Sequence, residues 1–84
     1  MEKERINDNM KITNIICVFT KKQHRYKESQ LIKDVVDHVS KYIKKDVQHM
    51  QECIQNRINH LIRIGYLMRD ERDLTILCYN SWHF

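Results

Sequence analysis

The sequence predicts an α+β domain in which three helices precede a β-hairpin. Apolar residues recur at the spacing of one helix face over three segments, at about residues 9–20, 29–43 and 46–64. The pattern changes to alternation after Gly65, on both sides of a charged turn at residues 70–73. Gly65 is the only glycine and proline is absent, so we expect few flexible linkers. With 84 residues, the chain has room for one domain.

The N-terminal part divides into a charged lead-in and a first helix. Residues 1–8 carry five charges and little apolar content, so we expect a flexible lead-in there and a folded domain over residues 9–84. The apolar face of the first helix consists of Ile12, Ile15, Ile16 and Phe19. The basic stretch 21–27 lacks this spacing and leaves room for a short strand at Tyr26.

Capping residues mark the next two helices. Ser29 is a suitable N-cap for the second helix, and Lys44 and Lys45 suit its end because cations are favourable near a helix C-terminus. Its apolar face consists of Ile32, Val35, Val36, Val39 and Ile43. Asp46 is expected to cap the third helix, and Gly65 stands where a left-handed C-cap requires glycine. The apolar stripe between them consists of Val47, Met50, Ile54, Ile58, Leu61 and Ile62.

The C-terminal part reads as two strands joined by a charged turn. The strands cover about residues 66–69 and 74–79, and in the second of them Leu74, Ile76 and Cys78 alternate with the other residues. Three helices followed by a hairpin, with a short strand after the first helix, is the order of a winged helix.

Composition limits the classes of function. The net charge of +4 favours acidic partners without identifying one. The three cysteines form no C-x-x-C pair, which favours a reducing compartment, the cytosol or nucleus, over a disulfide-bonded one. No apolar run reaches the length that spans a bilayer, so no membrane association is expected. The small size argues against a pocket-bearing enzyme, and nothing indicates a cofactor.

Three local features invite other interpretations. His49 and Cys53 are four residues apart on the third helix, with His60 about two turns beyond, but a fourth ligand is missing, so no metal site is predicted. Cys53 is expected at the edge of the core. No cleft or oxyanion donor supports Cys–His catalysis. The C-terminal Trp82-His83-Phe84 either folds back on the hairpin or contacts a neighbouring domain.

Two blocks resemble the C-terminal domain of the cullins, the scaffolds of RING ubiquitin ligases. Residues 54–69 are similar to the family's I-x-x-x-I-x-x-L-I-x-x-x-Y-[LI]-x-R block, and residues 70–79 resemble its acidic turn and final strand. That strand ends in an aromatic and a small residue, here Tyr79 and Ser81. The resemblance covers roughly residues 12–81 and implies a winged helix.

The resemblance also implies a modification site. Residues 29–32 are similar to the start of the family's second helix, and counting back without a gap places Lys21 on the lysine of the I-M-K-x-R-K motif, the neddylation site. Helix geometry independently turns Lys21 away from the apolar face. The motif departs from the family at Thr20, Gln23 and His24, and Trp82-His83-Phe84 extend past the usual end. Lys22 is the alternative acceptor, and both lysines also suit a helix C-terminus as plain cations.

The implied function is regulatory and non-catalytic. In the family, a ubiquitin-like modifier joined to this lysine releases the domain and its neighbouring RING subunit, which then presents a conjugating enzyme to substrate. The implied partners are the modifier, its conjugating enzyme, the RING subunit and the remainder of a cullin scaffold. His24, Arg25 and Lys27 are candidate partner contacts, or else solvated charges.

A DNA-binding winged helix is the alternative function. Such domains lay the third helix in the major groove, where Asn56 and Arg63 have side chains that read base edges. Glu52 on the same face and the acidic turn at residues 70–73 oppose contact with phosphates.

Overall fold

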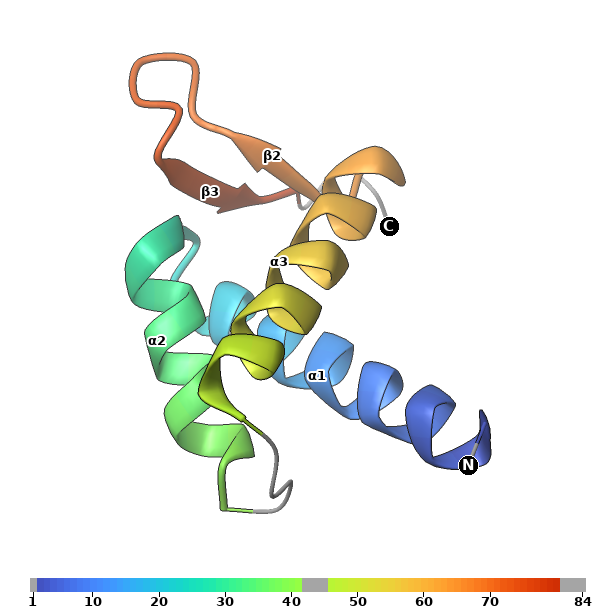
Figure 1. Ribbon diagram of the computed structural model, residues 1–84. Coiled ribbons are helices and arrows are strands. Elements are labelled where there is room, and N and C mark those ends of the chain that lie inside the picture. The colour runs from blue at the N-terminus through green and yellow to red at the C-terminus, as the bar shows by residue number, and fades with distance from the viewer. Residues whose placement is uncertain (1, 42–45, 81–84) are drawn as a thin grey trace.

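The computed structural model describes residues 2–41 and 46–80, and within these residues the chain forms a winged helix (Figure 1). The elements in chain order are α1 (Glu2–Lys22), β1 (Arg25–Lys27), α2 (Glu28–Val39), α3 (Val47–Arg63), β2 (Leu67–Arg69) and β3 (Ile76–Tyr79). The expected α+β order of helices and hairpin is confirmed, and so is the short strand at Tyr26.

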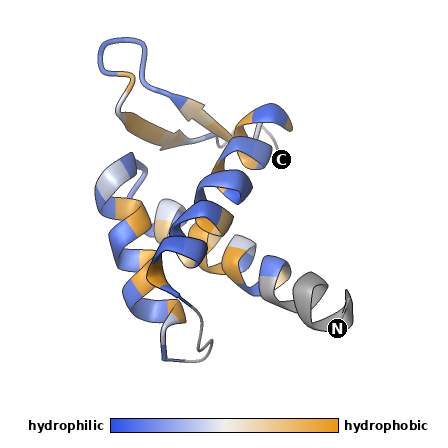
Figure 2. Cartoon of the chain, in the orientation of Figure 1, coloured by the Kyte–Doolittle hydropathy of each residue, from blue (hydrophilic) through white to orange (hydrophobic). Residues whose placement is uncertain are grey.

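The core lies between the helices and the inner face of the sheet. Figure 2 shows apolar segments on the helices where they face one another, while the loop between β2 and β3 is mostly hydrophilic. The side chains with less than 2 % exposure are Ile16, Leu31, Val35, Val39, Ile54, Ile58, Leu67, Leu77 and Thr20. Each helix and the two hairpin strands contribute to this set, so the wing is part of the core and not an appendage. Cys53 packs against the core edge, as predicted.

The sheet has the strand order β1-β3-β2, with both pairs antiparallel. Tyr26 lies opposite Leu77, and both side chains are buried. The inward face of β3 therefore contains Leu77, and the predicted alternation of Leu74, Ile76 and Cys78 was out of phase with the core. Leu74 is 66 % exposed and precedes the strand. Because apolar residues occupy both faces of this short strand, alternation alone did not identify the buried one.

The first helix is longer than the apolar spacing predicted. It begins at Glu2 and not near residue 9, and it ends at Lys22. Apolar spacing marks only the part of a helix that packs on a core, whereas charged residues with good helix propensity extend a helix without such a signal. The division of the chain into a flexible lead-in at residues 1–8 and a domain at 9–84 stays a prediction.

The second helix also has other bounds than expected. It begins at Glu28, with Lys27 as its cap residue, so Ser29 is not the N-cap. The N–H of Glu28 instead donates to the carbonyl of Thr75 at 2.8 Å, because β1 leads directly into the helix. The helix ends at Val39. Ile43, Lys44 and Lys45 lie outside the described residues.

The third helix lies between the two predicted cap positions, Asp46 and Gly65. Asp46 is its N-cap residue, although its side chain makes no capping hydrogen bond. Gly65 follows the helix with φ of 84°, the left-handed conformation that lacks a steric cost only for glycine. The chain thereby turns from α3 toward β2.

Candidate modification site

The end of α1 lies beside the end of the sheet. Lys21 and Lys22 form the last turn of the helix, and the backbone carbonyl of His24 accepts the N–H of Tyr79 at 3.0 Å. Tyr66, in the turn between α3 and β2, contacts the ring of Tyr79. We call this group, made of Lys21, Lys22, His24, Tyr66 and Tyr79, the Lys21 corner.

Thr20 anchors the helix end beneath this corner. Its side chain is fully buried, and its hydroxyl donates to the carbonyl of Ile16 at 2.9 Å. The residue that replaces the family's methionine is therefore a satisfied core residue. Lys21, the next residue, is exposed, as helix geometry predicted.

Tyr66 influences the charge of Lys21. A hydrogen bond between the two side chains is the main cause that raises the pKa of the Lys21 amine above its usual value, with the Tyr66 and Tyr79 phenols adding to the effect. Burial raises the pKa of the Tyr66 hydroxyl, and its hydrogen bond with Cys17 adds to this, whereas Lys21 acts in the opposite direction. The surroundings of Lys21 thus favour the charged form of its amine.

Three rings support the corner. The ring centroids of His24 and Tyr79 are 5.9 Å apart, and those of Tyr66 and Tyr79 are 5.5 Å apart at an interplanar angle of 63°. Sequence reasoning assigned no role to Tyr66. The strand pairing that brings these rings together depends on contacts between distant parts of the chain, and only the position of Tyr66 directly after the glycine turn was visible in the sequence.

The predicted partner contacts differ in their surroundings. Lys22, His24 and Lys27 have exposed side chains. Arg25 is also mostly exposed, but its guanidinium forms an ion pair with Asp70 at the start of the wing loop. A partner that uses Arg25 has to compete with this carboxylate.

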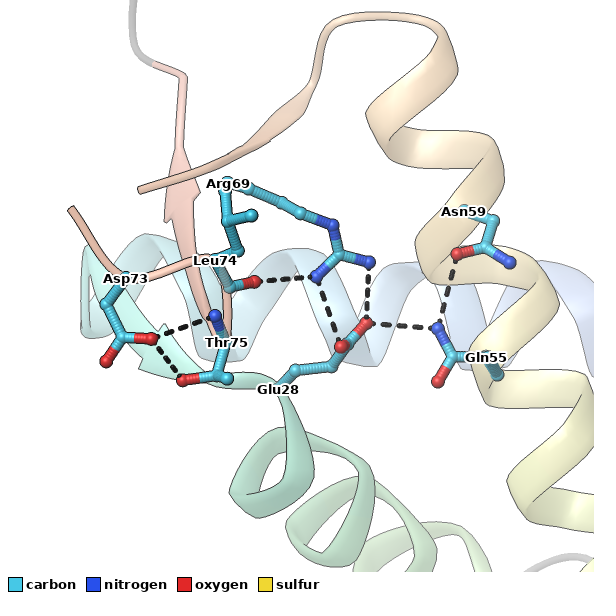
Figure 3. A network of polar contacts seen from close by, with 7 residues as sticks. All are labelled: Glu28, Gln55, Asn59, Arg69, Asp73, Leu74 and Thr75. Carbon is cyan, nitrogen blue, oxygen red and sulfur yellow. Dashed lines mark hydrogen bonds and ion pairs between the residues drawn. The ribbon is translucent and has the colours of Figure 1, made fainter. Parts of the chain in front are cut away.

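A second polar group lies between the wing, α2 and α3 (Figure 3). Arg69 donates from both terminal nitrogens to the carboxylate of Glu28, at 3.1 Å each, and Gln55 donates to the same carboxylate at 3.0 Å. Gln55 also donates to Asn59 at 3.2 Å. We call Glu28, Gln55, Asn59 and Arg69 the wing network. The wing network connects the hairpin with the first turn of α2 and the middle of α3.

The charge of Glu28 is stabilised by this network. Burial alone would raise the pKa of its carboxyl, but the hydrogen bonds from Arg69 and Gln55 outweigh burial and lower the pKa. At the wing loop, Thr75 donates its N–H and its hydroxyl to Asp73, at 3.0 and 2.6 Å, which lowers the pKa of Asp73 (Figure 3). Both carboxylates are ionised at neutral pH.

These charges bear on the predicted DNA contacts. Asn56 and Arg63 are both exposed on α3. The neighbouring amides of Gln55 and Asn59 are already engaged in the wing network. Between α3 and the wing, the guanidinium of Arg69 is engaged by Glu28 and so is less available for contacts to phosphate (Figure 3). The arrangement of this face therefore does not favour DNA.

His49 and Cys53 lie close together on α3. The sulfur of Cys53 lies 3.6 Å from Nε2 of His49, and among the residues whose side chains the structure describes, 9–41 and 46–80, no three possible ligands gather at one place. Nor does any helix in this described part of the chain combine the length and the apolar character needed to cross a membrane. Trp82, His83 and Phe84 lie outside the described residues.

Comparisons with known proteins agree with the fold. No family model matches the chain, and the comparison with curated proteins found no match either. Among solved structures, this chain is similar to the winged-helix B domain (WHB) of the cullin Cdc53. That structure comes from a study of a dual E3 mechanism for Rub1 ligation to Cdc53, in which the Cdc53 domain is paired with Dcn1(P). The TM-score is 0.76 at 18% identity, over 96% of this chain and 95% of that one. The chain thus has the winged-helix fold of a cullin WHB domain, as the resemblance in the sequence predicted.

Proposed function

We propose that the chain is a regulatory, non-catalytic winged-helix domain that accepts a ubiquitin-like modifier on Lys21, with Lys22 as the alternative acceptor. The observation that carries this proposal is the exposed Lys21 at the end of α1, at the position that the resemblance to cullins assigns to the acceptor. The likeness of the fold to the Cdc53 domain supports it.

The reaction requires the unprotonated amine of Lys21. The amine nitrogen attacks the thioester carbonyl that links the modifier to a cysteine of its conjugating enzyme, the C–S bond breaks, and an isopeptide bond forms. The thiolate leaves, and the proton lost by nitrogen passes to it or to solvent. Because a lysine amine is protonated at neutral pH, the conjugating enzyme supplies the environment that removes this proton.

The regulatory effect follows from differential contacts. A covalent modifier shifts a two-state arrangement only if it contacts the two states differently. In the proposed function, the unmodified domain rests against a RING subunit within a cullin-like scaffold, and modification releases both. In this proposal, the exposed His24 and Lys27 meet an acidic face of the modifier or of its conjugating enzyme. The free cysteines suit the reducing cytosol or nucleus where such ligases work.

The test is a reconstituted neddylation reaction on the domain, fused to or mixed with a RING partner and followed by intact mass. We expect one modifier to be added to the wild type and to Lys22→Arg, and none to Lys21→Arg. Addition that is lost only in Lys22→Arg would move the acceptor by one residue. The absence of any addition to the wild type would reject the proposed function and leave the fold intact.

A further inference from the structure

A pocket lies between the middle of α1 and the middle of α3. It has a volume of about 440 Å³ and is lined by Asn9, Met10, Thr13, Asn14 and Arg57. Of these five residues, only Arg57 carries a charge, and its side chain is half-buried. Arg57 belongs neither to the Lys21 corner nor to the wing network, so its role in the domain is still to be explained.

Thr13 holds the guanidinium of Arg57 in a fixed direction. Nε of Arg57 donates to the hydroxyl of Thr13 at 2.8 Å, and this hydroxyl donates its own proton to the backbone carbonyl of Asn9 at 2.8 Å. The side chain of Arg57 has therefore lost part of its rotamer freedom before any ligand binds. Its two terminal nitrogens form no hydrogen bond or ion pair with any residue that the structure describes. The outer side of the guanidinium is thus open to a ligand.

The charge of Arg57 has no nearby opposite charge along either helix. From residue 9 to residue 22, the sequence of α1 contains no Asp or Glu. On α3 the one acidic residue is Glu52, which lines another pocket together with Ser29 and Ile32 of α2. A half-buried cation loses part of its solvation, and an opposite charge compensates for this loss. The pocket therefore favours an anionic ligand.

We infer that this pocket binds the carboxylate of an aspartate or glutamate in an acidic segment of a partner protein. A carboxylate accepts two parallel hydrogen bonds from the terminal nitrogens of a guanidinium. The amides of Asn9 and Asn14 supply further donors, and Met10, which is 59% exposed, offers apolar surface to the residue beside the acid. A phosphate group carries about two negative charges at neutral pH and is matched less well by one guanidinium.

The pocket is separate from the proposed acceptor site on the same helix. Thr13 precedes Lys21 by eight residues, which corresponds to about 12 Å along a helix. The inference goes beyond the proposed function and does not depend on it, because binding of an acidic segment at Arg57 involves no modification of Lys21.

The test is an NMR titration of the domain with the capped peptide acetyl-Leu-Glu-Leu-Asp-Leu-amide. The control peptide, acetyl-Leu-Gln-Leu-Asn-Leu-amide, has the same apolar side chains and no carboxylate. We expect the acidic peptide alone to shift the Nε–H signal of Arg57 and the backbone amide signals of residues 9–14. The inference is overturned if millimolar acidic peptide leaves these signals unchanged, or if both peptides shift them equally.

Two arginine variants locate the binding on the domain. Arg57→Lys keeps the positive charge but loses the fork of donors, and Arg63→Lys is the matched control because Arg63 is an exposed arginine of the same helix. We expect the Kd of the acidic peptide to rise roughly tenfold in Arg57→Lys, the effect of losing one hydrogen bond between charged groups, and to stay unchanged in Arg63→Lys. An equal Kd in wild type and folded Arg57→Lys would refute the inference. The comparison of the two peptides needs no variant, so it decides the inference even if Arg57→Lys does not fold.

Inorganic phosphate is the third probe and separates the two kinds of anion. We expect it to shift the Arg57 signal less than the acidic peptide does at the same concentration. A larger response to phosphate would assign the pocket to phosphate groups and overturn the inference of a carboxylate site.

Discussion

The wing network and the Lys21 corner both lie beside the sheet, but the charges of the first are paired within the domain, whereas those of the second are exposed. In the wing network, a carboxylate and a guanidinium 41 residues apart in the chain form a bidentate pair, and the amide of Gln55 donates to the same carboxylate. In the Lys21 corner, the side chains of Lys21, Lys22 and His24 are exposed, and Tyr66 raises the pKa of the Lys21 amine.

This difference separates polar groups that hold the fold from polar groups that are open to partners. A half-buried charge is tolerated when an opposite charge and hydrogen bonds compensate for its lost solvation. Exposed cations keep their solvation and need no opposite charge within the domain. They can exchange water for a partner's carboxylates at a small desolvation cost. Mutations in the wing network should therefore change stability, and mutations in the Lys21 corner should change modification.

The largest effect is expected from Arg69→Ala, which leaves the Glu28 carboxylate without its cation. About a third of the Arg69 side chain and a fifth of Glu28 are exposed, so solvent takes over part of the lost interaction. We expect a loss of about 1–2 kcal/mol in the free energy of unfolding, measured by urea denaturation. The control Lys22→Ala should stay within about 0.5 kcal/mol of wild type. Equal losses in both variants would contradict the division between the two regions.

The two regions also differ in how far the sequence predicts them. The helices and the glycine turn were predictable because helical spacing and the conformation of Gly65 are local properties. Glu28 and Arg69 were not paired in advance, since their contact depends on the register of β1 and β3 and on the exact start of α2. The exposure of Lys21 followed from helix geometry, whereas the effect of Tyr66 on its pKa depends on how the turn after α3 packs near α1.

The next largest effect is expected from Glu28→Gln in the wing network, and its effect on the free energy of unfolding should depend on pH. The pKa of Glu28 is lower in the folded protein than in the unfolded chain, where a glutamate titrates at about 4.3. The unfolded state therefore binds more protons near this pH, and the stabilisation by Glu28 is fully present above the unfolded pKa and is lost as pH falls through the folded pKa. Glu28→Gln should be less stable than wild type at pH 7, with a difference that shrinks below about pH 4. Denaturation curves at both pH values check this, and a constant difference would contradict it.

The smallest effect on stability is expected from Arg25→Ala, because Arg25 shares features with both regions. Arg25 is exposed like the cations of the Lys21 corner, yet its ion pair with the nearly buried Asp70 resembles the wing network. Because the arginine is 62 % exposed, the pair is screened, and Arg25→Ala should cost only about 0.5 kcal/mol in unfolding free energy. The neighbouring exposed Lys27→Ala is the matched control and should cost less. A loss from Arg25→Ala as large as that from Arg69→Ala would place Arg25 with the residues that hold the fold. A small loss, together with faster modification when Asp70→Asn releases the guanidinium, would place Arg25 among the contacts for a partner.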